Sequence, residues 1–175
     1  MKIVSLLPAA TEILCDMGLA EYISAVSHEC DYPSTINNKL KITSSIIPHN
    51  INQNAIDKLV KEAVKNNIPL YEVDNEQLNK INPDLIITQG LCDVCSISED
   101  KIQATLKNNL CTLSSSTEII SLNGITFDEI CSDILTVGIA VNKEEIAQKL
   151  IKEAVGTKHK ITRERSSNSL LLLEW

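Results

Sequence analysis

Aromatic side chains and long apolar runs are both scarce in this chain of 175 residues. The aromatic residues are Tyr22, Tyr32, Tyr71, Phe127 and Trp175. Aliphatic side chains must therefore make most of the core. No apolar run approaches the roughly 20 residues that cross a bilayer, and the short stretch after Met1 and Lys2 ends at Pro8, too early for a secretory signal. These absences predict a cytoplasmic protein without membrane insertion.

Positive charge is also in short supply. The formal net charge is −7 and the isoelectric point is near 5.0, whereas binding to nucleic acid needs a basic surface. The basic residues between Lys149 and Arg165 alternate with glutamates, which is typical of a solvated helix face. The chain also lacks a Ser-His-Asp order, a phosphate-binding loop and an H-E-x-x-H sequence. We therefore expect neither a nucleic-acid partner nor enzymatic activity.

The pattern that is present is that of one α/β domain. Apolar residues make up 43% of the chain and charged residues 22%, which excludes a disordered class. Short apolar strands alternate with amphipathic helices, so the sequence predicts a parallel β-sheet with helices on both faces. The expected strands are 2–8, 22–27, 39–43, 70–73, 84–89 and 110–113. The expected helices are 10–17, 51–66, 76–81, 98–108 and 127–140.

A long polar helix and a last strand complete the predicted organisation. Asn142 is expected to cap a helix that reaches about Arg165, and four leucines follow at 170–173. A strand of this kind needs a neighbouring strand for its backbone groups, so it reads as the first strand of a second sheet. We therefore expect an α/β lobe at 1–141, a connecting helix at 142–168 and an opening strand at 169–175.

Chemistry-bearing side chains follow two of the expected strands. The strand at 84–89 leads into Gln89, Cys92 and Cys95, and the strand at 22–27 leads into the cluster Ser27–Pro33. In open α/β sheets the ligand crevice lies beyond the carboxyl ends of the strands. We therefore expect the two clusters to emerge side by side from adjacent strands and to face one site.

The thiols and the imidazole have several possible roles. Cys92 and Cys95 form a C-x-x-C pair that could supply half of a zinc or iron site, with Cys30 and His28 as the remaining ligands. The same pair could instead be a redox dithiol, contact a corrinoid, or merely line the cleft. His28 could ligate cobalt or iron, or it could be a histidine hydrogen-bonded at a strand end.

The other candidate residues have simpler interpretations. Glu29 and Asp31 could ligate a hard cation, but exposed acids in a turn explain them as well. Glu12 lies near the start of the first expected helix, where the helix dipole would stabilise its charge. The remaining cysteines are interpreted as small buried hydrophobes: Cys15, Cys111 and Cys131.

Four passages resemble a known family. They are V-S-L-L-P-A-A-T-E-I at Val4–Ile13, S-H-E-C-D-Y-P at Ser27–Pro33, P-D-L-I-I-T-Q-G-L-C-D-V-C at Pro83–Cys95 and L-L-E-W at Leu172–Trp175. Together with the order of strands and helices, they resemble the N-terminal lobe of the solute-binding proteins of vitamin B12, iron-siderophore and metal-chelate ABC importers. The second and third passages are similar to a branch without a secretory signal, usually labelled cobalamin-binding.

The resemblance implies a binding protein rather than an enzyme. In that family two α/β lobes are joined by one long helix and hold the ligand in the cleft between them; here we expect the second lobe to be missing after its opening strand. The implied ligand is cobalamin, another corrinoid or a metal chelate, and the implied partners are an ABC importer, a second lobe or a second copy of the chain. The implied ligand-binding residues are Pro8, Thr11, Glu12, His28, Glu29, Cys30, Tyr32, Gln89, Cys92 and Cys95.

Two other functions stay open at this point. The chain could be a cytosolic metal or redox protein that binds zinc or iron through His28, Cys30, Cys92 and Cys95. It could also be a truncated or split-gene half that works only with a second lobe or as a dimer.

Overall fold

A five-stranded parallel sheet forms the centre of the molecule in a computed structural model, which describes residues 1–48, 50–66, 68–89, 113 and 116–163. The strand order is β3-β2-β1-β6-β7, and every neighbouring pair is parallel. The strands are β1 (Ile3–Ser5), β2 (Ile23–Val26), β3 (Leu40–Lys41), β6 (Leu85–Gln89) and β7 (Glu118–Leu122). The α/β class and the parallel sheet predicted from the sequence are confirmed.

The central strands are apolar on both sides because helices cover both faces of the sheet. Ile3, Val4, Ile86 and Ile87 have no exposed surface. A strand buried on both faces reads as a continuous apolar run rather than an alternating one. This explains why the run at 84–87 predicted β6 correctly.

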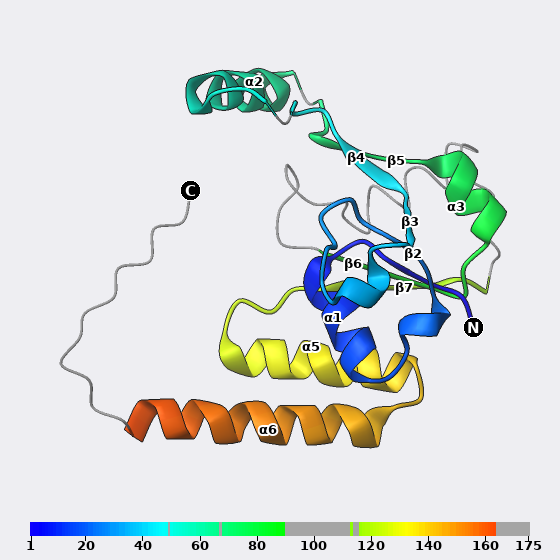
Figure 1. Ribbon diagram of the computed structural model, residues 1–175, viewed down its shortest axis with the longest axis vertical. Helices are drawn as coiled ribbons and strands as arrows, with labels where there is room; N and C mark the ends of the chain where they lie inside the picture. Colours follow the sequence, from blue (N-terminus) through cyan, green and yellow to red (C-terminus); the bar gives the residue numbers. More distant parts are fainter. Residues whose placement is uncertain (49, 67, 90–112, 114–115, 164–175) are drawn as a thin grey trace.

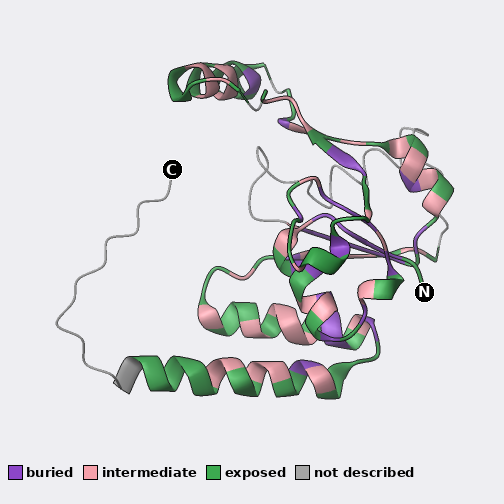
Figure 2. Ribbon diagram, viewed as in Figure 1, coloured by how far each residue is buried: buried purple, intermediate pink, exposed green. Residues whose placement is uncertain are grey.

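Three helices lie on one side of the sheet (Figure 1). They are α1 (Pro8–Asp16), α5 (Phe127–Ala140) and α6 (Glu144–Arg163). Leu14 of α1 and Val137 of α5 share a buried cluster with Ile3 and Ile87 of the sheet. Helix α6 packs along α5 and contributes Ala147 to the same cluster, while its outer side is exposed along most of its length (Figure 2).

Helix α3 (Asn75–Ile81) covers the opposite face. Its Leu78 packs in a second buried cluster with Val4 of β1, Ile86 of β6 and Ile42. The prediction of helices on both faces is therefore confirmed.

The segment between β3 and α3 differs from the prediction. Strands β4 (Thr43–Ser45) and β5 (Tyr71–Val73) form a separate two-stranded antiparallel sheet, and α2 (Gln53–Lys65) lies at its far end (Figure 1). We call residues 43–73 the ribbon arm. The expected strand at 70–73 exists, but it pairs with β4 instead of joining the parallel sheet.

Other boundaries also differ from the sequence analysis. Strand β7 was not predicted at all. Helix α6 begins at Glu144, and Asn142 has a φ of 55° in the turn before it. The 20 residues of α6 span roughly 30 Å at 1.5 Å per residue.

Several predictions lie outside the described residues, namely the helix at 98–108, positions 110–112 of the expected strand at 110–113 and the leucine strand at 169–175. The three-part division of the chain stays a prediction. Among the described helices, none combines the length and apolar character needed to cross a bilayer.

Candidate functional site

The direction of the strand order reverses at β1. From β1 the chain continues outward to β2 and β3 on one side, whereas β6 and β7 extend the sheet on the other side. Ligands of open α/β sheets bind outside the carboxyl ends of the strands at such a reversal. The candidate site is therefore the carboxyl edge, which we define as the segments that follow β1 and β2 together with Gln89 at the end of β6.

Of the two predicted clusters, Ser27–Pro33 follows β2 and the other begins with Gln89 at the end of β6, but these two strands are not adjacent. Strand β1 lies between β2, which leads to His28, and β6, which leads to Gln89. Two strand spacings separate their backbones by roughly 10 Å. The expectation of neighbouring strands is therefore wrong. Cys92 and Cys95 lie outside the described residues.

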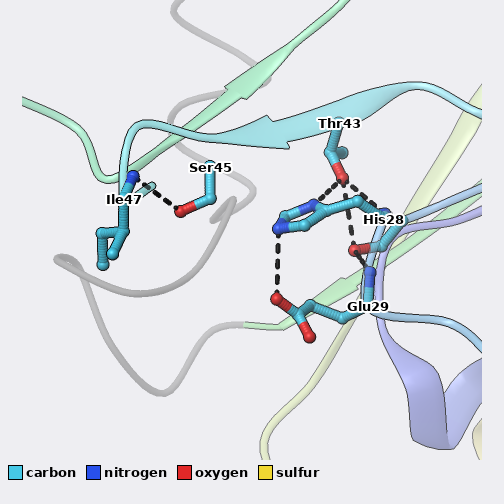
Figure 3. A network of polar contacts seen from close by, with 6 residues as sticks. His28, Glu29, Thr43, Ser45 and Ile47 are labelled. Carbon is cyan, nitrogen blue, oxygen red and sulfur yellow. Dashed lines mark hydrogen bonds and ion pairs between the residues drawn. The ribbon is translucent and has the colours of Figure 1, made fainter. Parts of the chain in front are cut away.

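His28 is held by the ribbon arm (Figure 3). Its backbone N–H donates to Thr43 Oγ1 at 2.9 Å, and its ring Nδ1 lies 2.6 Å from the same oxygen. The Tyr71 ring of β5 lies 5.3 Å from the imidazole, centroid to centroid, at an angle of 44°. A strand-end histidine with hydrogen bonds, one of the two roles expected for His28, is what the structure shows.

The other ring nitrogen of His28 faces Glu29. Nε2 lies 3.2 Å from Glu29 Oε1, within ion-pair distance. The same nitrogen is buried and has no hydrogen-bond partner within the described part of the chain, so its contact with Glu29 is one of ion-pair distance and not a hydrogen bond. Glu29 itself is exposed, with 62% of its side chain accessible.

Cys30 follows β2 at the carboxyl edge, but its side chain is buried in the core. Its residue surface is 0% exposed, and it belongs to the cluster that contains Leu14 and Val137. Burial raises the pKa of the Cys30 thiol, although the hydrogen bond from Thr11 opposes the rise. The Cys30 side chain is therefore buried in this structure, and its roles as a metal ligand or a ligand-contacting residue stay predictions.

Thr11 is also internal. It is fully buried, and its hydroxyl lies 2.8 Å from Ser5 Oγ, 3.2 Å from the Leu7 carbonyl oxygen and 3.2 Å from Cys30 Sγ. These contacts join α1 to the end of β1. Thr11 thus has internal partners in this structure, and its role in ligand binding stays a prediction.

Four other expected residues have surface at or near the carboxyl edge. Pro8 begins α1, and Gln89 ends β6; both are half-buried. Glu12 is exposed but lies beyond the first turn of α1, so its expected stabilisation at the helix start is not observed. Tyr32 is 65% exposed and precedes Pro33 through a cis peptide bond.

Sequence reasoning missed the residues that fix His28. Thr43 is 7% exposed and Ser27 5%, and their hydroxyls lie 3.2 Å apart. Ser27 was noted only as the start of a motif, and Tyr71 only as one of few aromatics. No local signal could have paired Thr43 and Tyr71 with His28, because the contact depends on how the ribbon arm folds back.

A protein metal centre is not assembled in the described residues. No group of three or more histidine, cysteine, aspartate or glutamate side chains is arranged there to hold an ion. The predicted four-ligand site stays a prediction: Cys92 and Cys95 lie outside the described residues, and of the other two members the Cys30 side chain is buried in the core.

Comparison with known proteins finds similar folds among solved structures. No protein-family model matches the chain, and no curated protein sequence matches it. Among solved structures, a possible iron-binding, periplasmic solute-binding protein from Staphylococcus epidermidis is 22% identical, with a TM-score of 0.66 over 96% of this chain and 52% of that one. A periplasmic heme-binding protein of Vibrio cholerae is 18% identical, with a TM-score of 0.62 over 96% and 51%.

A periplasmic vitamin B12-binding protein of Vibrio cholerae is 23% identical, with a TM-score of 0.55 over 87% of this chain and 46% of that one. The chain therefore spans about half the length of these structures. The likeness shows that it has the fold of one lobe of a helical-backbone binding protein, as the resemblance implied.

Proposed function

We propose that this chain is one lobe of a substrate-binding protein of the ABC-importer type and that it binds a small metal chelate at its carboxyl edge. The observation that carries the proposal is the match of 87–96% of the chain to half of proteins described as binding iron, heme and vitamin B12. A siderophore-binding protein of Vibrio cholerae, seen with ferric Desferal, shares the fold with a TM-score of 0.52. Binding without catalysis is the activity that these relatives support.

The carboxyl edge offers suitable side chains for a chelate. The exposed Tyr32 ring can cover the apolar face of a macrocycle, because an aromatic ring contributes a large apolar area with a polar tip. Gln89 and His28 add polar groups at the ends of β6 and β2. A mostly apolar surface with a few placed polar groups is the usual composition of a small-molecule site.

No specific observation favours either of the two alternative functions. A zinc or iron site built on four Cys and His ligands would need Cys30, whose side chain is buried in the core. The roles of Cys92 and Cys95, the cytoplasmic location, the homodimer and the partnership with an importer or a second lobe stay predictions.

The proposal is tested by titrating the full chain with hemin, cobalamin, cobinamide and ferric desferrioxamine, using absorbance and calorimetry. Two tyrosines provide a matched pair of variants. Tyr32→Ala removes an exposed ring at the carboxyl edge, whereas Tyr22→Ala removes one that is 48% exposed and lies just before β2, at the opposite edge. We expect Tyr32→Ala to weaken binding about tenfold, equivalent to about 1.4 kcal/mol, and Tyr22→Ala to leave it unchanged.

Failure of all four chelates to bind would refute the proposed ligand class. Equal effects of the two tyrosine variants would instead refute the location of the site, because only Tyr32 lies at the carboxyl edge.

A further inference from the structure

The loop that follows β7 lies at the same edge of the sheet as the candidate site. Strand β7 runs parallel to β6, and its last residue, Leu122, is the register partner of Gln89. Because parallel strands end together, residues 123–126 continue the carboxyl edge beyond Gln89. We call these residues the β7 loop; they connect β7 to α5 (Figure 1).

Two carboxylates of α5 hold the backbone of the β7 loop. Gly124 N–H donates to Asp133 Oδ2 at 2.8 Å. The N–H groups of Ile125 and Thr126 donate to Glu129 Oε2 at 3.0 Å and 2.8 Å. Hydrogen bonds to an ionised acceptor are roughly twice as strong as neutral ones. A Cβ added at Gly124 would lie 2.7 Å from a backbone nitrogen of α5, so the loop rests directly on that helix.

The loop presents an apolar side chain to solvent. Ile125 is 77% exposed, more than any other large apolar side chain in the described part of the molecule, and the nearby Ile130 is 44% exposed. A single exposed apolar residue is common on a protein surface. Here, however, the backbone is held by three hydrogen bonds, so the loop cannot rearrange freely to turn Ile125 inward. Apolar surface is thus kept in water at the edge where a ligand is expected.

The position of the β7 loop sets the breadth of a ligand that could reach it. Strands β1 and β6 lie between β2 and β7, so three strand spacings separate the ends of β2 and β7 by roughly 14 Å. The exposed Tyr32 follows β2, and Ile125 follows β7. A porphyrin or corrin ring with its side chains has about this breadth, whereas a ferric hydroxamate is more compact.

We propose that Ile125 is a specificity-determining residue that packs against the apolar face of a flat macrocyclic chelate, a porphyrin or a corrin, and that Asp133 and Glu129 are positioning residues that fix its loop. The role of Ile125 rests on the proposed function and narrows its ligand class. A macrocycle contacts Tyr32 and Ile125 at the same time. A compact chelate reaches only one of them.

Two isoleucines of similar exposure test the contact. Ile125→Ser changes the β7 loop, whereas Ile139→Ser changes a side chain that is 57% exposed near the far end of α5. The full chain is titrated with hemin, cobalamin, cobinamide and ferric desferrioxamine. We expect Ile125→Ser to weaken binding of a macrocycle about tenfold, because an apolar contact is lost. Ile139→Ser should leave macrocycle binding unchanged, and neither variant should alter binding of ferric desferrioxamine.

Each outcome of these titrations decides a different point. Macrocycle binding that Ile125→Ser weakens no more than Ile139→Ser would refute the contact. Binding of ferric desferrioxamine alone would refute the macrocyclic ligand class and leave the proposed function standing. Silence of all four chelates would refute the proposed function and the role of Ile125 together.

Amide hydrogen exchange of the ligand-free full chain tests the positioning residues without any chelate. We expect Asp133→Ala to accelerate exchange of the Gly124 amide about tenfold and to weaken macrocycle binding, while binding of ferric desferrioxamine is unchanged. Asp133→Asn retains an acceptor oxygen and should lie between wild type and Asp133→Ala. Unchanged exchange at Gly124 in folded Asp133→Ala would contradict the positioning role; if that variant does not fold, Asp133→Asn decides it by the same measurement.

Discussion

His28 and Cys30 are two residues apart but lie in opposite environments. The His28 side chain retains 18% of its accessible surface at the end of β2, while Cys30 has none and packs with α1 and α5. The Cys30 N–H donates a hydrogen bond to the Ser27 carbonyl oxygen at 3.1 Å. This bond closes a short turn that carries Cys30 toward the core. In this structure only His28 of the pair therefore has side-chain surface at the carboxyl edge.

The buried thiol gives the protein a specific dependence of stability on alkaline pH. Burial raises the pKa of folded Cys30 above its ordinary value of 9.0. The unfolded chain therefore releases the thiol proton first, and the contribution of Cys30 to stability is present below pH 9.0 and is lost as the pH rises from there toward the folded pKa. Urea unfolding should show that the difference in free energy of unfolding between wild type and Cys30→Ala shrinks from about pH 7.5 to about pH 10.

Cys15 is present in both proteins, so its own raised pKa cancels in this difference. If the difference in free energy of unfolding between wild type and Cys30→Ala stays constant over the same pH range, the Cys30 thiol is not shielded from water.

Gly138 is required by the close approach of two helices. A Cβ added there would lie 2.4 Å from the Cβ of Ala147, whereas at Gly156 it would meet nothing within 4 Å. We expect Gly138→Ala to lower the free energy of unfolding by about 1–3 kcal/mol through overpacking. Gly156→Ala should raise it by about 0.5–1 kcal/mol because alanine favours the helix. Thermal or urea unfolding measures both, and equal effects would mean that α5 and α6 do not pack closely here.

At the scale of elements, local signals predicted the helices well. The expected helix at 127–140 begins with a capping box, T-F-D-E at Thr126–Glu129: Glu129 N–H donates to Thr126 Oγ1 at 3.3 Å, and Thr126 N–H donates to Glu129 Oε2 at 2.8 Å. The backbone N–H groups of Thr126 and Ile125 lower the pKa of the Glu129 carboxyl. The expected helix at 10–17 is followed by Gly18, whose φ of 76° suits a glycine after the end of α1. These signals depend on residues three or four positions apart, so sequence is enough to detect them.

The capping box can be tested with a second threonine of the same helix. Thr126→Ala should lower the free energy of unfolding by about 1 kcal/mol, because a helix donor loses its acceptor. Thr136→Ala should change it by less than about 0.5 kcal/mol, because Thr136 is exposed in the middle of α5. A loss at Thr136 as large as that at Thr126 would contradict the capping contribution.

Strand pairing could not be predicted from local sequence in the same way. The apolar run at Leu70–Val73 predicted a strand correctly, but its partner β4 lies more than 25 positions earlier in the chain. Strand β7 was missed because it lies at the edge of the sheet, with Glu118 exposed and Ile119 and Ile120 only half-buried. Its sequence therefore lacks the uniformly apolar character of β6. Pairing is decided by long-range contacts that no local pattern encodes.

At the scale of the whole molecule, the strand order decides where a ligand can bind. The sequence predicted that residues after β2 and β6 would reach one edge, because parallel strands end together. It could not predict that β1 would separate them, nor that the ribbon arm would bring Thr43 to His28. The position of the edge was thus predictable from the chain, whereas the contacts that define the His28 environment were not.

Amide chemical-shift mapping of the nitrogen-15-labelled chain tests the central claim, binding at the carboxyl edge, most directly. Hemin, cobalamin, cobinamide and ferric desferrioxamine are added in turn, and the shifts of the described residues are followed. For at least one chelate, we predict changes concentrated at residues 6–12 and 27–33, with little change at 20–22 and 82–84 on the opposite edge. Changes confined to that opposite edge, or no change with any of the four chelates, would contradict the account.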